Sequence, residues 1–320
     1  MPTDLTATAP LPLNTLLDIP AAQYHALDRL SSSGIKQLLR SPAKYKAWRA
    51  GEVGKRSAAL SFGTLLHHLV LEPGSFARSY SLGPSMAGIK TKSGTDALNP
   101  LATTEGKERL AAWHAANPDV QIIDLADRDK AFRMHDSLEK RGFIEAFAEG
   151  RHEVTILWDA NVGGVTVPCK ARMDCYAPNL DLKTCANIDD DAIVRDAFSY
   201  GYHIQAAWYG GASVQVCFNQ PLGFVFIETE PPYQCVLKTP DVEVVEHGRL
   251  LVAQALTRYA ECTQTGTWYG VEYFADPLLR LPPWAKRKGE AAESERRELA
   301  SGMDADGVRS DIDDVFGGAL

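Results

Sequence analysis

The order of the predicted elements constrains the fold of this chain more than any other feature. Helices are expected first, over residues 31–40, 58–71, 103–116 and 127–140. Strands follow at 152–158, 165–173 and 179–184, then helices at 189–197 and 202–218, strands at 222–228 and 233–237, and a last helix at 241–264. This order predicts an α/β domain in which helices flank a mixed central β-sheet of about five strands.

Composition divides the chain into three regions. Residues 1–20 are rich in Pro, Thr, Ala and Leu and are expected to form a flexible N-terminal arm, followed by one domain over residues 21–280. Residues 281–320 are charged and are expected to be a tail that is disordered or loosely helical. The acidic end of the tail, Asp311–Phe316, is expected to aid solubility, with recruitment of a partner protein as the alternative.

Composition also limits the classes of protein to consider. The formal net charge of -8 argues against a broadly basic nucleic-acid coat, although a local basic channel is compatible with it. The sequence has no secretory signal, no apolar run of the ~20 residues that a membrane span needs, and no Cys-x-x-Cys pair among its 6 cysteines. We therefore expect a cytoplasmic protein without a membrane span, a zinc site or an iron–sulfur cluster.

Three charged residues stand at the ends of two consecutive predicted strands. Asp174 ends one apolar run, while Asp181 and Lys183 lie two apart in the next strand, so their side chains point to the same face. A hairpin through residues 176–178 would bring Asp174 beside them. Two carboxylates can hold Mg²⁺, which polarises a phosphate and activates water, and a lysine can position that water or stabilise developing charge. Alone, this common pattern is more simply explained as a solvated strand.

Two further motifs lie on predicted helices before and after these strands. His67 ends a Gly-x-x-x-His sequence, and Tyr202, Gln205 and Tyr209 share one helical face because of their spacing. Each motif alone is explained by packing, as a core histidine or as a helix surface lying on a sheet. Their order along the chain is what adds information.

In this order the motifs resemble those of the RecB-like branch of the PD-(D/E)XK nucleases, and more narrowly the nuclease domain of RecE-type exonucleases (exodeoxyribonuclease VIII). The resemblance covers roughly residues 22–265 and rests on the stretches 31–39, 63–73, 181–184 and 202–209. It implies a PD-(D/E)XK nuclease core. It also implies an exodeoxyribonuclease that uses Mg²⁺, or Mn²⁺ in its place, and digests linear double-stranded DNA 5′→3′, leaving 3′ single strands for recombination.

The resemblance implies a role for each matching residue. Lys183 would act on the attacking water, and Gln205 and Tyr209 would line the site. The implied metal ligands are Asp174, Asp181, the Leu182 carbonyl and His67, with Glu153 as support for a second metal. Candidate DNA-binding residues are Tyr202, Arg172 and two lysines of a glycine-containing loop, Lys90 and Lys92. A basic helix face formed by Lys36, Arg40 and Lys44 is expected to be solvated.

The resemblance also implies partners. These are double-stranded DNA ends, a RecT-like single-strand annealing protein and further copies of the chain, with a tetramer favoured, in a bacterial or phage-encoded setting. Two alternatives stay open. One is a different RecB-like nuclease, either a single-strand exonuclease or a structure-specific endonuclease. The other is a catalytically silent DNA-binding subunit.

Overall fold

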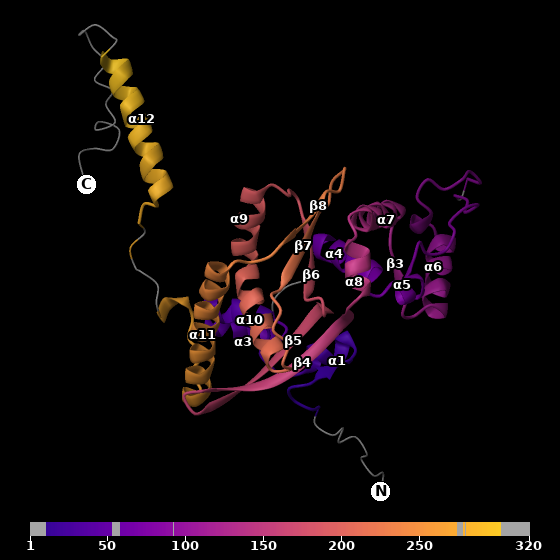
Figure 1. Ribbon diagram of the computed structural model, residues 1–320. Helices are drawn as coiled ribbons and strands as arrows, with labels where there is room; N and C mark the ends of the chain where they lie inside the picture. Colours follow the sequence, from indigo (N-terminus) through magenta and orange to yellow (C-terminus); the bar gives the residue numbers. More distant parts are fainter. Residues whose placement is uncertain (1–10, 53–57, 92, 274–277, 279, 302–320) are drawn as a thin grey trace. The chain divides into compact units, whose positions relative to one another are not determined.

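A mixed six-stranded sheet forms the centre of the fold (Figure 1). The computed structural model describes residues 11–52, 58–91, 93–273, 278 and 280–301. In their order across the sheet, the strands are β1 (Leu16–Leu17), β4 (Arg151–Val162), β5 (Val165–Tyr176), β6 (Leu180–Cys185), β7 (Gly223–Glu228) and β8 (Cys235–Lys238). Only β6 and β7 pair in parallel among these described strands, which confirms the predicted mixed α/β sheet.

Helices account for most of the remaining described chain. Before the sheet come α1 (Ala21–Ala26), α2 (Ser32–Arg40), α3 (Pro42–Arg49), α4 (Ala58–Leu71), α5 (Pro73–Ser79), α6 (Thr104–Ala116), α7 (Leu125–Lys140) and α8 (Phe143–Ala148). Later helices are α9 (Asp190–Tyr200), α10 (Tyr202–Val214), α11 (Val242–Thr265) and α12 (Pro283–Ser301). The short strands β2 (Tyr80–Ser81) and β3 (Gln121–Ile122) form a separate parallel pair.

Two hydrophobic cores, one on each face, fix the helices to the sheet. On one face Ile35 and Leu38 of α2 pack with Trp208 of α10, whose ring centroid lies 4.8 Å from that of Trp158 on β4. The other face is covered by apolar side chains of α4, α7 and α8, and its fully buried members include Leu66, Met134, Leu138, Phe147, Leu182 and Val225. The helices of both layers therefore have fixed positions around β6.

The connections between strands follow from their pairing. A two-glycine turn, Gly163 and Gly164 with φ of 57° and 82°, joins β4 to β5, which pair from end to end except at Glu153 and Asp174. The parallel pair β6 and β7 needs a crossover, which α9 and α10 provide. In contrast, β5 and β6 pair at a single position, Cys175 opposite Leu180, and separate beyond it.

The structure differs from the predictions mainly at the ends of the domain. Leu16 and Leu17, predicted to lie in a flexible arm, form β1 and pair with β4, which half-buries both side chains. Residues 283–301 of the predicted tail form α12, consistent with their many helix-favouring Ala, Glu, Lys and Arg residues. The chain divides into compact units at 1–270 and 271–320, and the acidic segment Asp311–Phe316 lies outside the described residues.

Segments that lack a strong apolar period account for the other differences. The short helices α1, α3, α5 and α8 and the pair β2–β3 have no counterpart among the predicted elements.

No helix within the described ranges is both long enough and apolar enough to cross a lipid bilayer.

Gly248 tests the close packing of α11 on α10, the helix that carries Gln205. A Cβ added at Gly248 would lie 2.1 Å from the carbonyl oxygen of His203, so Gly248→Ala must push the helices apart. We expect it to lower the free energy of unfolding by about 1–3 kcal/mol, measured by urea denaturation.

The matched control for this prediction is Gly211→Ala on α10. A Cβ there meets no atom within 4 Å, so this change should raise helix stability by about 0.5–1 kcal/mol. A Gly248→Ala protein as stable as the wild type would contradict the close helix contact.

Candidate active site

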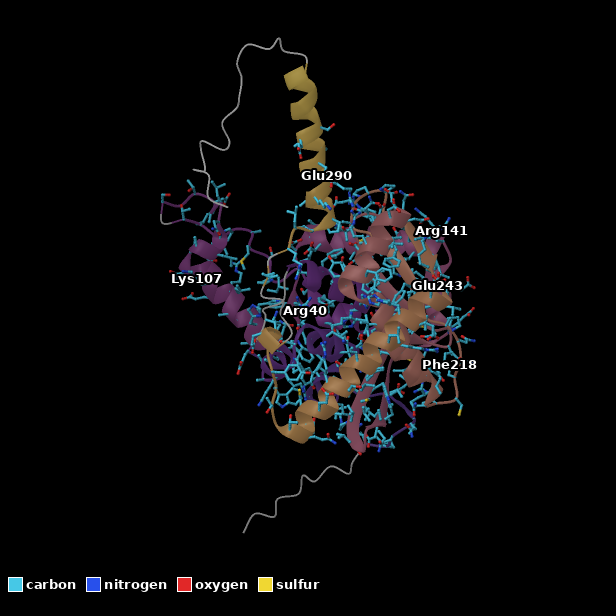
Figure 2. All side chains as sticks on the ribbon, turned by 90° about the vertical axis from the view of Figure 1, so that its left-hand side faces the viewer. Arg40, Lys107, Arg141, Phe218, Glu243 and Glu290 are labelled. Carbon is cyan, nitrogen blue, oxygen red and sulfur yellow. The ribbon has the colours of Figure 1, made fainter. Side chains whose placement is uncertain are left out.

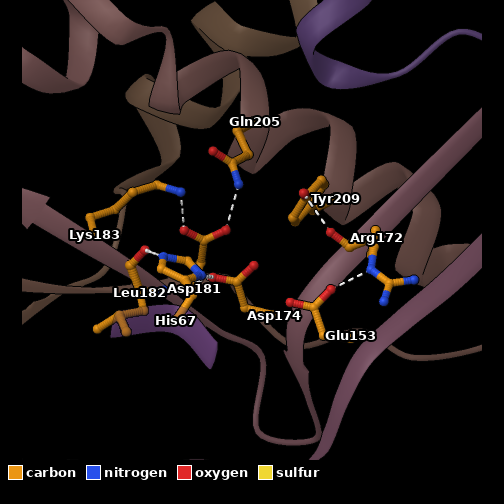
Figure 3. A network of polar contacts seen from close by, with 9 residues as sticks. All are labelled: His67, Glu153, Arg172, Asp174, Asp181, Leu182, Lys183, Gln205 and Tyr209. Carbon is orange, nitrogen blue, oxygen red and sulfur yellow. Dashed lines mark hydrogen bonds and ion pairs between the residues drawn. The ribbon is translucent and has the colours of Figure 1, made fainter. Parts of the chain in front are cut away.

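Five elements bring polar side chains together where β5 and β6 separate (Figure 3). Asp174 comes from the end of β5, and Asp181 and Lys183 come from β6. His67 reaches the site from α4 on one face of the sheet, and Gln205 from α10 on the other. Glu153 lies on β4 in the same network.

Asp181 is the most deeply buried charged residue of this group, with 1% of its surface exposed. Gln205 donates a 2.5 Å hydrogen bond from Nε2 to Asp181 Oδ1. The other oxygen, Oδ2, forms an ion pair with the Lys183 ammonium but receives no hydrogen bond of ordinary geometry. Alternation along β6 places Asp181 and Lys183 on the α10 face, while Leu182 between them packs into the opposite core.

Asp174 compensates for the separation of β5 from β6. Its Oδ2 accepts a 3.0 Å hydrogen bond from the backbone N–H of Leu182. His67 donates from Nε2 to the Leu182 carbonyl at 2.8 Å, and its Nδ1 lies 3.4 Å from the same Asp174 oxygen. In the neutral ring with this tautomer, Nδ1 carries a lone pair, so a lone pair and a carboxylate face each other across this contact.

Burial governs the protonation of these groups. Burial, together with the neighbouring Asp181, raises the pKa of Asp174 well above its ordinary range. Burial and the nearby Lys183 charge lower the pKa of His67. Burial alone would lower the pKa of Lys183, but Asp181 and Asp174 outweigh it and raise that pKa above its ordinary value, so the ammonium stays charged.

The donor atoms of this group fit a hard cation. Two carboxylates, the Leu182 carbonyl and the His67 Nδ1 lone pair belong to one contact network with Lys183, and Asp181 Oδ2 accepts no hydrogen bond. A cation held here would offset the unfavourable burial of the Asp174 charge. Among the described residues, His135, Asp136 and Glu139 on α7 are the group of three metal-ligand side chains whose ligand atoms all lie within 4.8 Å of one another, and both carboxylates of this group are exposed. The ligand atoms of Asp174, Asp181 and His67 are spaced more widely than this.

The site opens into a cleft of about 800 Å³. Its walls come from α1, α2, α4, β4, β6, α9 and α10, and the lining residues are Ala21, Ala22, His25, Lys36, Gly63, Thr64, His67, Glu153, Leu182, Lys183, Thr184, Tyr200, Tyr202 and Gln205. The Tyr202 ring lies 5.1 Å from the Lys183 ammonium and packs on Phe224. Burial raises the pKa of Tyr202 to about 12, so its hydroxyl stays neutral.

Some residues predicted for the site have other partners. Arg172 does not line the cleft: it forms an ion pair with Glu153 and donates to the Ile19 carbonyl at 2.7 Å, so a carboxylate already neutralises its charge. Tyr209 donates a 2.6 Å hydrogen bond to the Arg172 carbonyl and supports β5 rather than lining the cleft. Glu153 does line the cleft, and at φ 53° it has the left-handed backbone that non-glycine residues rarely adopt.

Lys90, one of the two loop lysines predicted to bind DNA, has its partner outside this network. Lys90 forms an ion pair with Asp96 at 2.5 Å and lines a different hollow, beside the start of α6. Lys92 lies outside the described residues.

The sequence interpretation missed two parts of the cleft wall. α1 lies in a segment without a clear apolar period, yet Ala21, Ala22 and His25 line the cleft. Lys36, predicted to be solvated, also lines it, whereas Arg40 on the same helix is exposed (Figure 2). A signal was available for Lys36, because it follows the apolar Ile35 and precedes Leu38, which places it at the border of the buried face.

A mixed sheet between two helical layers, with an Asp and an Asp-x-Lys at the point where two strands separate, defines a PD-(D/E)XK-like fold. Residues 31–271 match the family described as "PDDEXK-like domain of unknown function (DUF3799)", and the chain belongs to this family. No curated protein matches the chain.

Solved structures support the fold assignment. A crystal structure from Eubacterium rectale named "Putative exonuclease" is similar, with a TM-score of 0.51 and 16% identity over 83% of this chain and 96% of that one. A structure named SSO0001 matches with a TM-score of 0.25 and 13% identity over 46% of this chain and 68% of that one, which is too weak to support an argument.

The buried charge of Asp174 leads to a prediction for stability. With a folded-state pKa above the unfolded value, the folded protein binds more protons, so stability falls as pH rises from the unfolded pKa through the folded one. Asp174→Asn keeps an acceptor for the Leu182 N–H but carries no charge. In EDTA at pH 7 we therefore expect this variant to be more stable than the wild type, by urea denaturation.

The difference between the two proteins should disappear near pH 3, where both side chains are neutral. If the wild type is instead more stable than Asp174→Asn in EDTA at pH 7, the burial of the Asp174 charge is not unfavourable and the prediction is wrong.

Proposed function

We propose that this protein is a Mg²⁺-dependent exodeoxyribonuclease that digests linear double-stranded DNA 5′→3′ and leaves 3′ single strands for recombination. The observation that carries the proposal is the network of Asp174, Asp181 and Lys183 beside an open cleft. Lys183, His67 and Gln205 line the cleft, and the last two contact the carboxylates of Asp174 and Asp181. The RecE-type resemblance supplies the polarity and the biological setting.

Mg²⁺ would be held by the Asp174 and Asp181 carboxylates, with the Leu182 carbonyl and His67 as further donors. When bound, it would polarise the scissile phosphate and lower the pKa of a water molecule. Mn²⁺ is expected to substitute, because carboxylate and carbonyl oxygens suit both ions.

The residues of the chain provide the arrangement around the reacting phosphate. Gln205 fixes the Asp181 carboxylate, and the Leu182 N–H fixes that of Asp174. Lys183 is charged in this environment, so it is better suited to orienting water and stabilising the developing phosphate charge than to removing a proton. The Tyr202 ring forms an apolar wall beside the Lys183 ammonium.

The proposal extends to partners. A RecT-like single-strand annealing protein would take up the 3′ strand, and a ring-like homo-oligomer, with a tetramer favoured, would retain the DNA end during digestion. These statements rest on the family resemblance alone, as does a cytoplasmic location in a bacterium.

Lys183→Ala should abolish digestion. We expect nucleotide release from linear duplex DNA with Mg²⁺ to fall by at least about a hundredfold, because a pre-positioned charge at the reacting phosphate is lost. The matched control is Lys107→Ala, which removes an exposed lysine of α6 (Figure 2) and should leave the rate unchanged. Equal rates for Lys183→Ala and the wild type would exclude the assigned site. A wild type equally inactive with Mg²⁺ and with EDTA would favour a silent DNA-binding subunit.

The form of the substrate separates an exonuclease from other RecB-like nucleases. The wild type with Mg²⁺ should release nucleotides from linear duplex DNA and leave a covalently closed circular duplex intact, as followed on gels. Cutting of the closed circle would indicate an endonuclease, and digestion of single strands alone would indicate a single-strand exonuclease.

A further inference from the structure

Lys36 has an unusual position among the basic residues of α2. Its side chain extends into the cleft, and its ammonium lies 5.8 Å from the centroid of the Tyr202 ring. The Lys183 ammonium lies 5.1 Å from the same ring. Two positive charges from α2 and β6 therefore converge on one aromatic side chain beside Asp181.

The backbone holds Lys36 in this place. Its stem passes over Gly201, where an added Cβ would lie 3.0 Å from Lys36 Cε and 3.3 Å from Cδ. Gly201 also has a φ of +70°, which allows the sharp turn between α9 and α10. The turn thus presents Tyr202 to the cleft and leaves room for the lysine stem above it.

In the part of the chain that the structure describes, Lys36 has no ion-pair partner of its own, although the Asp181 carboxylate, which pairs with Lys183, acts on its charge from nearby. Lys183 pairs with Asp181 and Arg172 with Glu153, but among the described residues Lys36 forms no ion pair with a carboxylate. Burial, and then repulsion from Lys183, lower the pKa of Lys36 to about 8. An anion in the cleft would relieve both effects, because it would supply the missing counter-charge between two ammonium groups.

We propose that Lys36, held over Tyr202, binds a backbone phosphate of the DNA strand in the cleft, next to the phosphate at the Asp174–Asp181 site. This inference rests on the proposed function and adds the residue that positions the strand. The alternative, a general basic face on α2, predicts that Arg40 contributes equally, since it lies one turn further along the same helix.

The test measures DNA binding rather than cleavage. A fluorescein-labelled linear duplex is titrated with full-length protein by fluorescence anisotropy, with Ca²⁺ in place of Mg²⁺, over a series of salt concentrations. Each phosphate contact contributes roughly 0.9 to the slope of log affinity against log salt for B-form DNA. Lys36→Gln should weaken binding and reduce the magnitude of that slope by roughly 1.

Two matched variants make the result specific. Lys36→Arg keeps the positive charge and should retain the wild-type slope. Arg40→Gln removes the same charge from an exposed position of α2 and should also leave the slope unchanged. Urea denaturation of each variant shows whether the fold is kept, so a loss of binding through misfolding is recognised.

The outcomes separate this inference from the proposed function. An unchanged slope for Lys36→Gln would overturn the inference, as would an equal reduction for Arg40→Gln, which indicates a general basic face. If the wild type releases no nucleotides with Mg²⁺ but Lys36→Gln alone reduces the slope, the proposed reaction fails and the phosphate contact stands. If the wild type digests DNA and Lys36→Gln has the same salt slope as the wild type, the proposed reaction stands and the phosphate contact fails.

Discussion

The Asp181 carboxylate is withdrawn from water at a buried strand, and the surrounding elements are arranged to hold it. Removing a charged group from water costs several kcal/mol unless a partner charge and hydrogen bonds replace the solvent. Lys183 on the same strand supplies the charge and Gln205 the hydrogen bond. Because Gln205 comes from α10, the ion pair depends on the packing of this helix against α11 and the sheet. Chemistry and folding therefore depend on the same contacts.

The sequence was sufficient to predict most of the fold. Long segments with a clear apolar period, such as 58–71 and 241–264, became helices at nearly the predicted bounds. The alternation in 152–173 and its two-glycine turn predicted the hairpin of β4 and β5. Some short pieces, such as β1 and α3, were not predicted, because their few positions show no clear apolar alternation or helical period. Their structure depends on tertiary contacts.

For the site, the order of the motifs located Asp174, Asp181, Lys183, His67 and Gln205, which the structure brings together. Individual side-chain directions could not be predicted. Tyr202 and Tyr209 share one face of α10 but lie seven positions apart, about 10 Å along the helix axis, so one lines the cleft while the other supports β5. Similarly, nothing in the sequence pairs Arg172 with Glu153, because strand register decides which residues face each other. The direction of the Lys36 side chain could not be predicted either, because it depends on the space that Gly201, a residue far along the chain, leaves for it.

The single pairing position between β5 and β6 has a consequence for how this fold can change in evolution. Beyond Cys175 and Leu180 the backbone ladder stops, and the Asp174 side chain takes the Leu182 N–H that a strand neighbour would otherwise bind. Position 174 thus carries an acceptor for the sheet and, in the proposed function, also a charge for the metal. A lineage that abandons the proposed nuclease chemistry loses only the need for the charge, so asparagine is the replacement that keeps the acceptor for the Leu182 N–H. No single replacement of Lys183 is tolerated in the same way. Losing this lysine leaves the buried Asp181 charge without its partner, so a second substitution at Asp181 is needed.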